Sequence, residues 1–64
     1  MALVPMNYEV RCDTLITLTG EPERWRTQRH LPSATLEEAS TAVNDFLNRF
    51  GGGEHQIVMR GKVI

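Results

Sequence analysis

Apolar residues between positions 35 and 53 recur at alternating steps of three and four, which is the period of an amphipathic helix. The apolar stripe consists of Leu36, Ala39, Ala42, Val43, Phe46, Leu47 and Phe50. Thr35 and Glu38 have the spacing of a capping box at the start of this helix. The glycines at 51–53 are expected to end it, because glycine adopts the left-handed conformation of a helix stop without steric cost.

Three other segments have the pattern of β-strands. Residues 7–19 alternate between apolar and polar positions, with Tyr8, Val10, Cys12, Ile16 and Leu18 on one side. Gly20 and Pro22 predict a turn over residues 20–23, and residues 24–31 form a second, more polar strand. Pro32 and Ser33 are expected to end that strand. Residues 56–64 predict a third strand with Ile57, Met59 and Val63 on one face.

The order strand, strand, helix, strand predicts an α+β fold of ββαβ type. A short turn makes the first two strands an antiparallel hairpin, and the right-handed crossover rule allows the third strand to lie beside the first. We therefore expect one domain over residues 1–64. It is a three-stranded, mainly antiparallel sheet of order 2-1-3 with the helix on one face.

A loop at residues 20–23 also predicts the register of the hairpin. Leu18 would lie opposite Trp25, and Cys12 opposite Leu31, which brings apolar side chains together beneath the helix. This pairing favours a core role for Trp25 over a role as an exposed interface anchor.

One part of this register leaves two alternatives. Thr14 would lie opposite Arg29 and both would point inward. Either Arg29 lies at the margin of the helix, where its charged end can reach water, or a bulge near Asp13 resets the alternation. In the same register His30 lies opposite Asp13, which predicts a solvated ion pair between them.

Composition restricts the class of protein. The chain has 64 residues, 41 % of them apolar, one cysteine, seven basic and eight acidic residues. A single cysteine cannot form an intramolecular disulfide, which is consistent with a reducing cytoplasm. The apolar residues 1–6 are too few to span a membrane and lack the features of a signal peptide. A soluble, unprocessed cytoplasmic protein is therefore expected.

On the predicted fold, basic side chains gather on the sheet face away from the helix. They are Arg11, Arg24, Arg26, Arg60 and Lys62. Glu9 and Asp13 are the acids of that face, whereas Glu37, Glu38 and Asp45 make the exposed helix surface acidic. One interpretation is a merely solvated open sheet. The other is a partner-binding surface, because arginine matches carboxylates and phosphates through its planar guanidinium.

No catalytic, cofactor-binding or metal-binding residues are predicted. Cys12, His30 and His55 lack the paired spacing of a zinc site, and Cys12 at an inward position is expected to be a small buried side chain. The glycines at 51–53 follow a helix and lack the lysine of a phosphate-binding loop. We therefore expect that the protein is not an enzyme and needs no cofactor.

The helix opening Ala34-Thr35-Leu36-Glu37-Glu38-Ala39, after a hairpin and before a glycine-terminated last strand, resembles two groups of small proteins. One group is the phage-encoded inhibitors of host machinery, such as the RNA polymerase inhibitor of T7-like phages and anti-CRISPR proteins. The other is the antitoxin domain of HicB type. The resemblance implies a ββαβ protein that acts by binding another macromolecule.

Three hypotheses follow. The first is a protein-binding module, such as a phage or mobile-element inhibitor, that docks on an acidic partner through the basic sheet face or a strand edge. The second is nucleic-acid binding, which is disfavoured because Tyr8 and Trp25 are both expected to point inward and leave no aromatic side chain for base stacking. The third is a homodimer formed through a free sheet edge or the segment 1–6.

Overall fold

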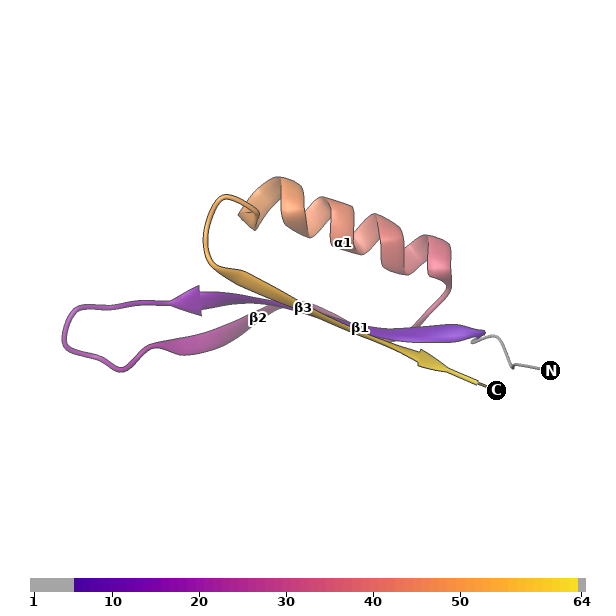
Figure 1. Cartoon of the computed structure of the whole chain (residues 1–64), viewed down its shortest axis with the longest axis horizontal. Helices are drawn as coiled ribbons and strands as arrows, with labels where there is room; N and C mark the ends of the chain where they lie inside the picture. Colours follow the sequence, from indigo (N-terminus) through magenta and orange to yellow (C-terminus); the bar gives the residue numbers. More distant parts are fainter. Residues whose placement is uncertain (1–5, 64) are drawn as a thin grey trace.

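The computed structural model describes residues 6–63 of the chain. It contains β1 (Asn7–Ile16), β2 (Arg24–Ala34), α1 (Leu36–Phe50) and β3 (His55–Lys62), in that order. The three strands form one sheet of order β2-β1-β3 in which both neighbours of β1 run antiparallel to it. The helix lies over one face of this sheet (Figure 1). The predicted ββαβ fold and strand order are confirmed.

The helix begins at the predicted capping box. The Glu38 backbone N–H donates to Thr35 Oγ1 at 3.1 Å, and the Thr35 N–H donates to Glu38 Oε1 at 3.0 Å. These bonds satisfy two of the N–H groups that a helix start leaves without partners. Ala39, Ala42 and Phe46 are buried against the sheet, as the apolar stripe predicts.

The end of the helix differs from the expectation. Gly51 has a φ of −65° and is therefore right-handed, and no glycine of 51–53 has a positive φ. Its N–H donates to the carbonyl oxygen of Leu47 at 2.8 Å. A Cβ atom at Gly51 would collide with that same oxygen. Close approach of the backbone, and not a left-handed conformation, is therefore what requires glycine here.

The hairpin loop is longer than predicted. β1 ends at Ile16 instead of residue 19, so the loop covers residues 17–23. Gly20 has a φ of +83°, the left-handed region that glycine tolerates best, and the Glu21 N–H donates to the Leu18 carbonyl at 3.1 Å. This loop projects past the end of the helix (Figure 1). Correspondingly, the radius of gyration is 14.0 Å, against about 11 Å for a compact chain of this length.

The register of the hairpin is also different, because the loop is three residues longer than predicted and β2 contains a bulge. Cys12 lies opposite Arg29 and Asp13 lies opposite Thr27, so Gln28 is an extra residue. The predicted pairing of Cys12 with residue 31 is therefore wrong. The bulge near Asp13, one of the two alternatives that the sequence left open, is present. Arg29 nevertheless faces the helix layer opposite Cys12 and is exposed at the margin of α1, as the other alternative held.

Trp25 is the residue most affected by the bulge. It lies opposite Leu15 and not opposite Leu18. Leu15 is three residues from the core residue Cys12 on the same strand, so its side chain is on the other face of the sheet. Trp25 therefore points away from the helix, and 46 % of its surface is exposed. The predicted core role of this tryptophan is wrong.

The end of β2 contains a second irregularity. Val10 lies opposite Leu31, but Tyr8 lies opposite Ala34, so β2 carries another extra residue around Pro32. The strand was expected to end at Pro32 and instead continues to Ala34. Proline is tolerated there because β2 is an edge strand and the position is bulged.

β3 begins one residue earlier than predicted and ends at Lys62. Ile57 lies opposite Cys12, and Met59 lies opposite Val10, so both face the helix as expected. Val63 follows the end of the strand. Residue 64 and residues 1–5, which include most of the proposed dimerisation arm, lie outside the described part of the chain.

The core is small and lies between the helix and the centre of the sheet. It consists of Val10, Cys12, Ala34, Ala39 and Phe46, with Tyr8, Leu31, Val43, Phe50 and Ile57 packed around it. The Phe46 ring contacts the rings of Phe50 and His55, with centroid distances of 5.4 and 5.8 Å. Within residues 6–63, no helix is long and apolar enough to cross a membrane.

Candidate binding surface

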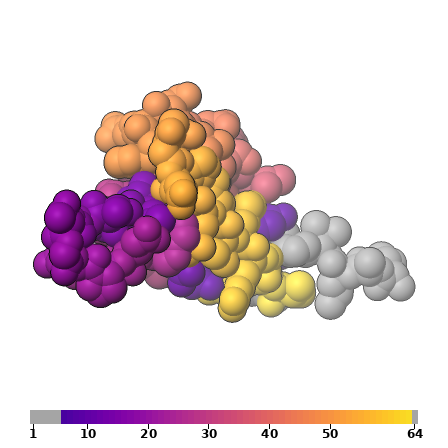
Figure 2. All heavy atoms as spheres, turned by 60° about the vertical axis from the view of Figure 1, so that its left-hand side comes forward, coloured from indigo at the N-terminus to yellow at the C-terminus, as the bar shows by residue number. Residues whose placement is uncertain are grey.

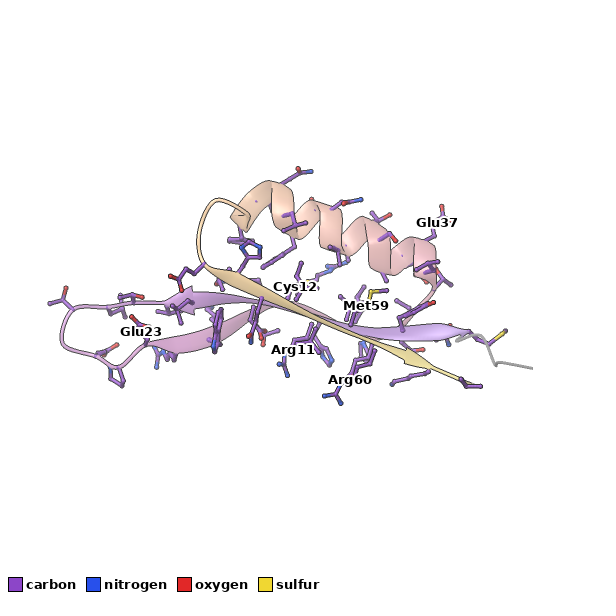
Figure 3. All side chains as sticks on the ribbon, in the orientation of Figure 1. Arg11, Cys12, Glu23, Glu37, Met59 and Arg60 are labelled. Carbon is purple, nitrogen blue, oxygen red and sulfur yellow. The ribbon has the colours of Figure 1, made fainter. Side chains whose placement is uncertain are left out.

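The sheet face turned away from α1, here called the open face, is the candidate site. Its side chains are Glu9, Arg11, Asp13 and Leu15 of β1, Trp25, Thr27 and His30 of β2, and Gln56, Val58, Arg60 and Lys62 of β3. Arg11 and Arg60 point to this side, whereas Cys12 and Met59 point toward the helix (Figure 3). No element among residues 6–63 covers the open face.

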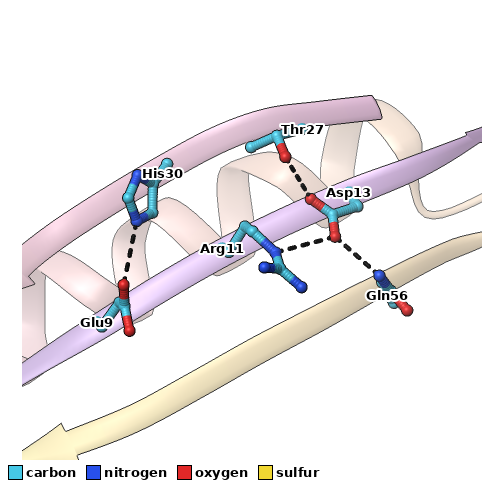
Figure 4. A network of polar contacts seen from close by, with 6 residues as sticks. All are labelled: Glu9, Arg11, Asp13, Thr27, His30 and Gln56. Carbon is cyan, nitrogen blue, oxygen red and sulfur yellow. Dashed lines mark hydrogen bonds and ion pairs between the residues drawn. The ribbon is translucent and has the colours of Figure 1, made fainter. Parts of the chain in front are cut away.

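Asp13 lies at the centre of the open face and is nevertheless buried, with 2 % of its surface exposed. Thr27 Oγ1 donates to one carboxylate oxygen at 2.8 Å, and Gln56 Nε2 donates to the other at 2.8 Å. Arg11 Nε also reaches the second oxygen, at 3.1 Å. These contacts join all three strands through one carboxylate (Figure 4).

The environment of Asp13 favours its charged form. Burial by itself would raise the pKa of the carboxyl group. The hydrogen bonds from Gln56 and Thr27, together with the charge of Arg11, outweigh this effect and hold the pKa below its ordinary value. Asp13 therefore supports the sheet as a carboxylate and is a poor proton donor near neutral pH.

The predicted register placed His30 opposite Asp13, but the two side chains do not pair. It lies opposite Arg11, and its Nε2 atom is 3.3 Å from Glu9 Oε2. The hairpin loop accounts for this difference, because its three extra residues shift the pairing by three and the bulge at Gln28 restores only one of them.

A shallow hollow of about 320 Å³ lies on the open face beside this pair. It is lined by Glu9, Arg11, His30, Val58 and Arg60. The apolar Val58 among arginine and histidine side chains gives this hollow a mixed character. Such a hollow can receive a side chain that has both an apolar stem and a negative end.

The open face holds only part of the predicted basic set. Arg11, Arg60 and Lys62 lie on it, and Lys62 Nζ donates to the Pro32 carbonyl at 2.9 Å. Arg24 and Arg26 do not lie on it. They lie opposite Ile16 and Thr14, which are on the same face of β1 as the core residue Cys12, the face toward the helix.

The bulge therefore moves two arginines to the helix side of the projecting hairpin. The open face keeps three cationic side chains against the two carboxylates of Glu9 and Asp13, and is less basic than expected. The exposed helix surface carries the predicted acids Glu37, Glu38 and Asp45, and Asp45 pairs with Arg49 at 3.5 Å.

The surroundings of Cys12 disfavour its reactive thiolate form. Cys12 is fully buried, and burial together with the nearby charge of Asp13 raises the pKa of its thiol, although Arg29 opposes this effect. Among residues 6–63, no three His, Cys, Asp or Glu side chains lie close enough to bind a metal ion together.

Sequence reasoning missed five members of this surface, namely Leu15, Trp25, Thr27, Gln56 and Val58. The sequence signal for Thr27 and Gln56 was the outward position of Asp13 on a central strand, since a carboxylate there needs polar neighbours on both adjacent strands. Comparison of the chain with protein-family models, curated proteins and solved structures finds no match. The resemblances to phage inhibitors and antitoxin domains therefore stay predictions.

Proposed function

We propose that this protein is a small non-catalytic binding module that docks on another protein through its open face. The observation that carries this proposal is the position of Trp25, which lies beside Leu15 on an uncovered sheet face with nearly half of its surface exposed. Tryptophan and arginine are the side chains that contribute most often to binding energy at protein interfaces.

The open face supplies two kinds of contact side by side. Trp25 and Leu15 form an apolar end toward the hairpin loop. Arg60 and the hollow around Val58 form a polar, weakly basic end. Because a planar guanidinium binds a carboxylate through two parallel hydrogen bonds, an acidic side chain is the preferred occupant of that hollow.

The class of partner is inferred from the resemblance noted in the sequence. Phage-encoded inhibitors of similar length and element order act on host machinery, which favours a cytoplasmic host enzyme or nuclease complex as the target. An inhibitor of anti-CRISPR or polymerase-inhibitor type is the form of this proposal that the resemblance supports.

The test is a capture experiment with matched arginine variants. Wild-type protein, Trp25→Ala, Arg60→Glu and Arg24→Glu are each immobilised, and proteins retained from host lysate are quantified by mass spectrometry. We expect Trp25→Ala and Arg60→Glu to lose the partner and Arg24→Glu to keep it, because Arg24 lies on the other face. Equal loss for both arginine variants would contradict docking through the open face.

Nucleic acid is a second candidate, since the exposed ring of Trp25 removes the expectation that no aromatic side chain lies outside. It is weaker, because sheet-based readers stack two or three bases and the chain carries a net charge of −1. A mobility shift with single-stranded oligonucleotides that weakens with salt and is lost in Trp25→Ala would favour it.

A further inference from the structure

The two edges of the sheet differ in how well they could accept another strand. The β2 edge is interrupted by two bulges, and it carries Pro32, which cannot donate a hydrogen bond. β3 pairs with β1 from residue 55 to residue 62 without a register shift. The β3 edge is therefore regular, and the β2 edge is irregular.

Backbone groups of β3 point outward along this regular edge. The Leu15 N–H donates to the Glu54 carbonyl at 3.1 Å, so even-numbered residues of β3 direct their hydrogen bonds toward β1. The odd-numbered residues His55, Ile57, Met59 and Gly61 direct theirs away. No strand among residues 6–63 pairs with this side, and β3 lies at the surface along its length (Figure 2).

The centre of the β3 edge is apolar on both faces. Met59 points toward the helix layer but remains 41 % exposed, since α1 packs over β1 and β2. Ile57 and Val58 are half-buried. An unpaired, regular strand with an apolar centre is the kind of edge that pairs with another strand.

We propose that β3 pairs antiparallel with β3 of a second copy of this chain, about a two-fold axis at Val58. In this register Ile57 lies opposite Met59 of the second copy, and the outward N–H and C=O groups of both residues form hydrogen bonds. The result is a continuous six-stranded sheet with both helices on the same face. The symmetry is closed, so association stops at the dimer.

Charge complementarity identifies a second copy as the occupant. The same register brings Glu54 opposite Lys62 of the second copy and diagonal to its Arg60, and the two-fold axis repeats this contact at the other end. The exposed Lys62 amine exchanges its hydrogen bond to the Pro32 carbonyl for this contact. A register centred on Arg60 would instead place two arginines face to face. Of these two registers, only the one centred on Val58 is complementary in charge.

This inference does not depend on the proposed function. Pairing through the β3 edge leaves the open face of each copy uncovered, and Trp25 lies on β2, at the opposite edge of the sheet. The dimer and the binding of a partner protein can therefore succeed or fail separately.

Analytical ultracentrifugation of the full chain tests the dimer. Over about three decades of concentration up to about 1 mM, we expect the mass to rise from the 7.3 kDa of one chain to twice that value. Met59→Pro removes an outward N–H without removing a bond to β1, and should leave the protein monomeric throughout. Met59→Leu keeps the N–H and the apolar side chain, and should retain the dimer.

A charge exchange tests the register and does not rely on proline. Glu54→Lys should raise the dissociation constant of the dimer about tenfold, because each dimer contains two such contacts. Adding Lys62→Glu to Glu54→Lys should restore it, and circular dichroism verifies the fold of each variant. A wild-type chain that is monomeric at all concentrations, or a charge exchange that restores nothing, would overturn the proposal. If Met59→Pro fails to fold, the charge exchange decides.

Discussion

At the scale of single residues, Asp13 is the feature that most distinguishes this sheet. A charged group seldom tolerates burial, because the loss of water must be offset by hydrogen bonds and opposite charge. Asp13 obtains hydrogen bonds from Thr27 of β2 and Gln56 of β3, and a hydrogen bond with opposite charge from Arg11 of its own strand β1. No buried side-chain polar atom among the described residues lacks a partner. The carboxylate therefore acts as a cross-link between the three strands.

Asp13→Asn should lower the free energy of unfolding by about 1–3 kcal/mol at neutral pH, since donors then face an amide N–H₂ group. Because the folded-state pKa of Asp13 is lowered, its contribution is complete above about pH 4 and is lost as the pH falls through the folded-state pKa. Urea unfolding from neutral to acid pH measures this. The variant should lose less stability in acid than the wild type, whereas Glu21→Gln in the exposed loop should behave as the wild type does.

Cys12 should be unreactive in the folded protein. Burial, followed by the charge of Asp13, raises the pKa of its thiol and disfavours the reactive thiolate. We expect alkylation by iodoacetamide to be slow in buffer and fast in concentrated urea, with labelling followed by mass spectrometry. Equal rates in both conditions would mean that the strand opens readily around Cys12.

At the scale of elements, the capping box is the best-defined local signal, and Thr35→Ala tests it. The variant loses the hydroxyl that accepts from the Glu38 N–H, which should cost about 1 kcal/mol of unfolding free energy. Thermal or urea unfolding provides the measurement. Ser40→Ala, an exposed substitution inside the same helix, should not destabilise the protein. Similar losses in both variants would contradict a specific role for the cap.

The helix and the strand order could be predicted because they depend on short-range patterns. The stripe from Leu36 to Phe50 and the capping residues lie within one segment, and the crossover rule leaves few ways to place the last strand. The hairpin loop could not be predicted. Thr17 and Leu18 continue the alternation of β1, but both are exposed, and the chain leaves the sheet at Ile16.

The candidate site was predicted less well than the fold, for one physical reason. Alternation in a strand has a period of two, so one extra residue puts the side chains on its two sides out of step with each other. Gln28 is such a residue, and a glutamine among polar neighbours gives no sequence signal of a bulge. As a result, Trp25 lies on the open face, whereas Arg24 and Arg26 lie on the helix side. Arg11, Arg60 and Lys62 are on strands without this bulge and lie where the pattern predicted.

At the scale of the whole molecule, the fold combines a small core with a long unsupported hairpin. Of the six buried hydrophobic residues among those described, three are alanines. Residues 17–30 are all exposed and extend the molecule to 52 Å along its longest axis. The hairpin presents surface to a partner without adding to the core, and stability therefore depends on a few large side chains under the helix.

Phe46 is the largest buried side chain, and its removal tests how concentrated the stability is. A 64-residue domain has a total unfolding free energy of about 3–10 kcal/mol, and Phe→Ala in a core costs about 3–5 kcal/mol. Phe46→Ala should therefore lose about a third or more of the unfolding free energy, seen as a lower midpoint of urea unfolding followed by circular dichroism. Leu36→Ala, at an exposed apolar position of the same helix, should remain folded. If both variants unfold at the same urea concentration, the packing of α1 on the sheet contributes far less stability than this arrangement requires.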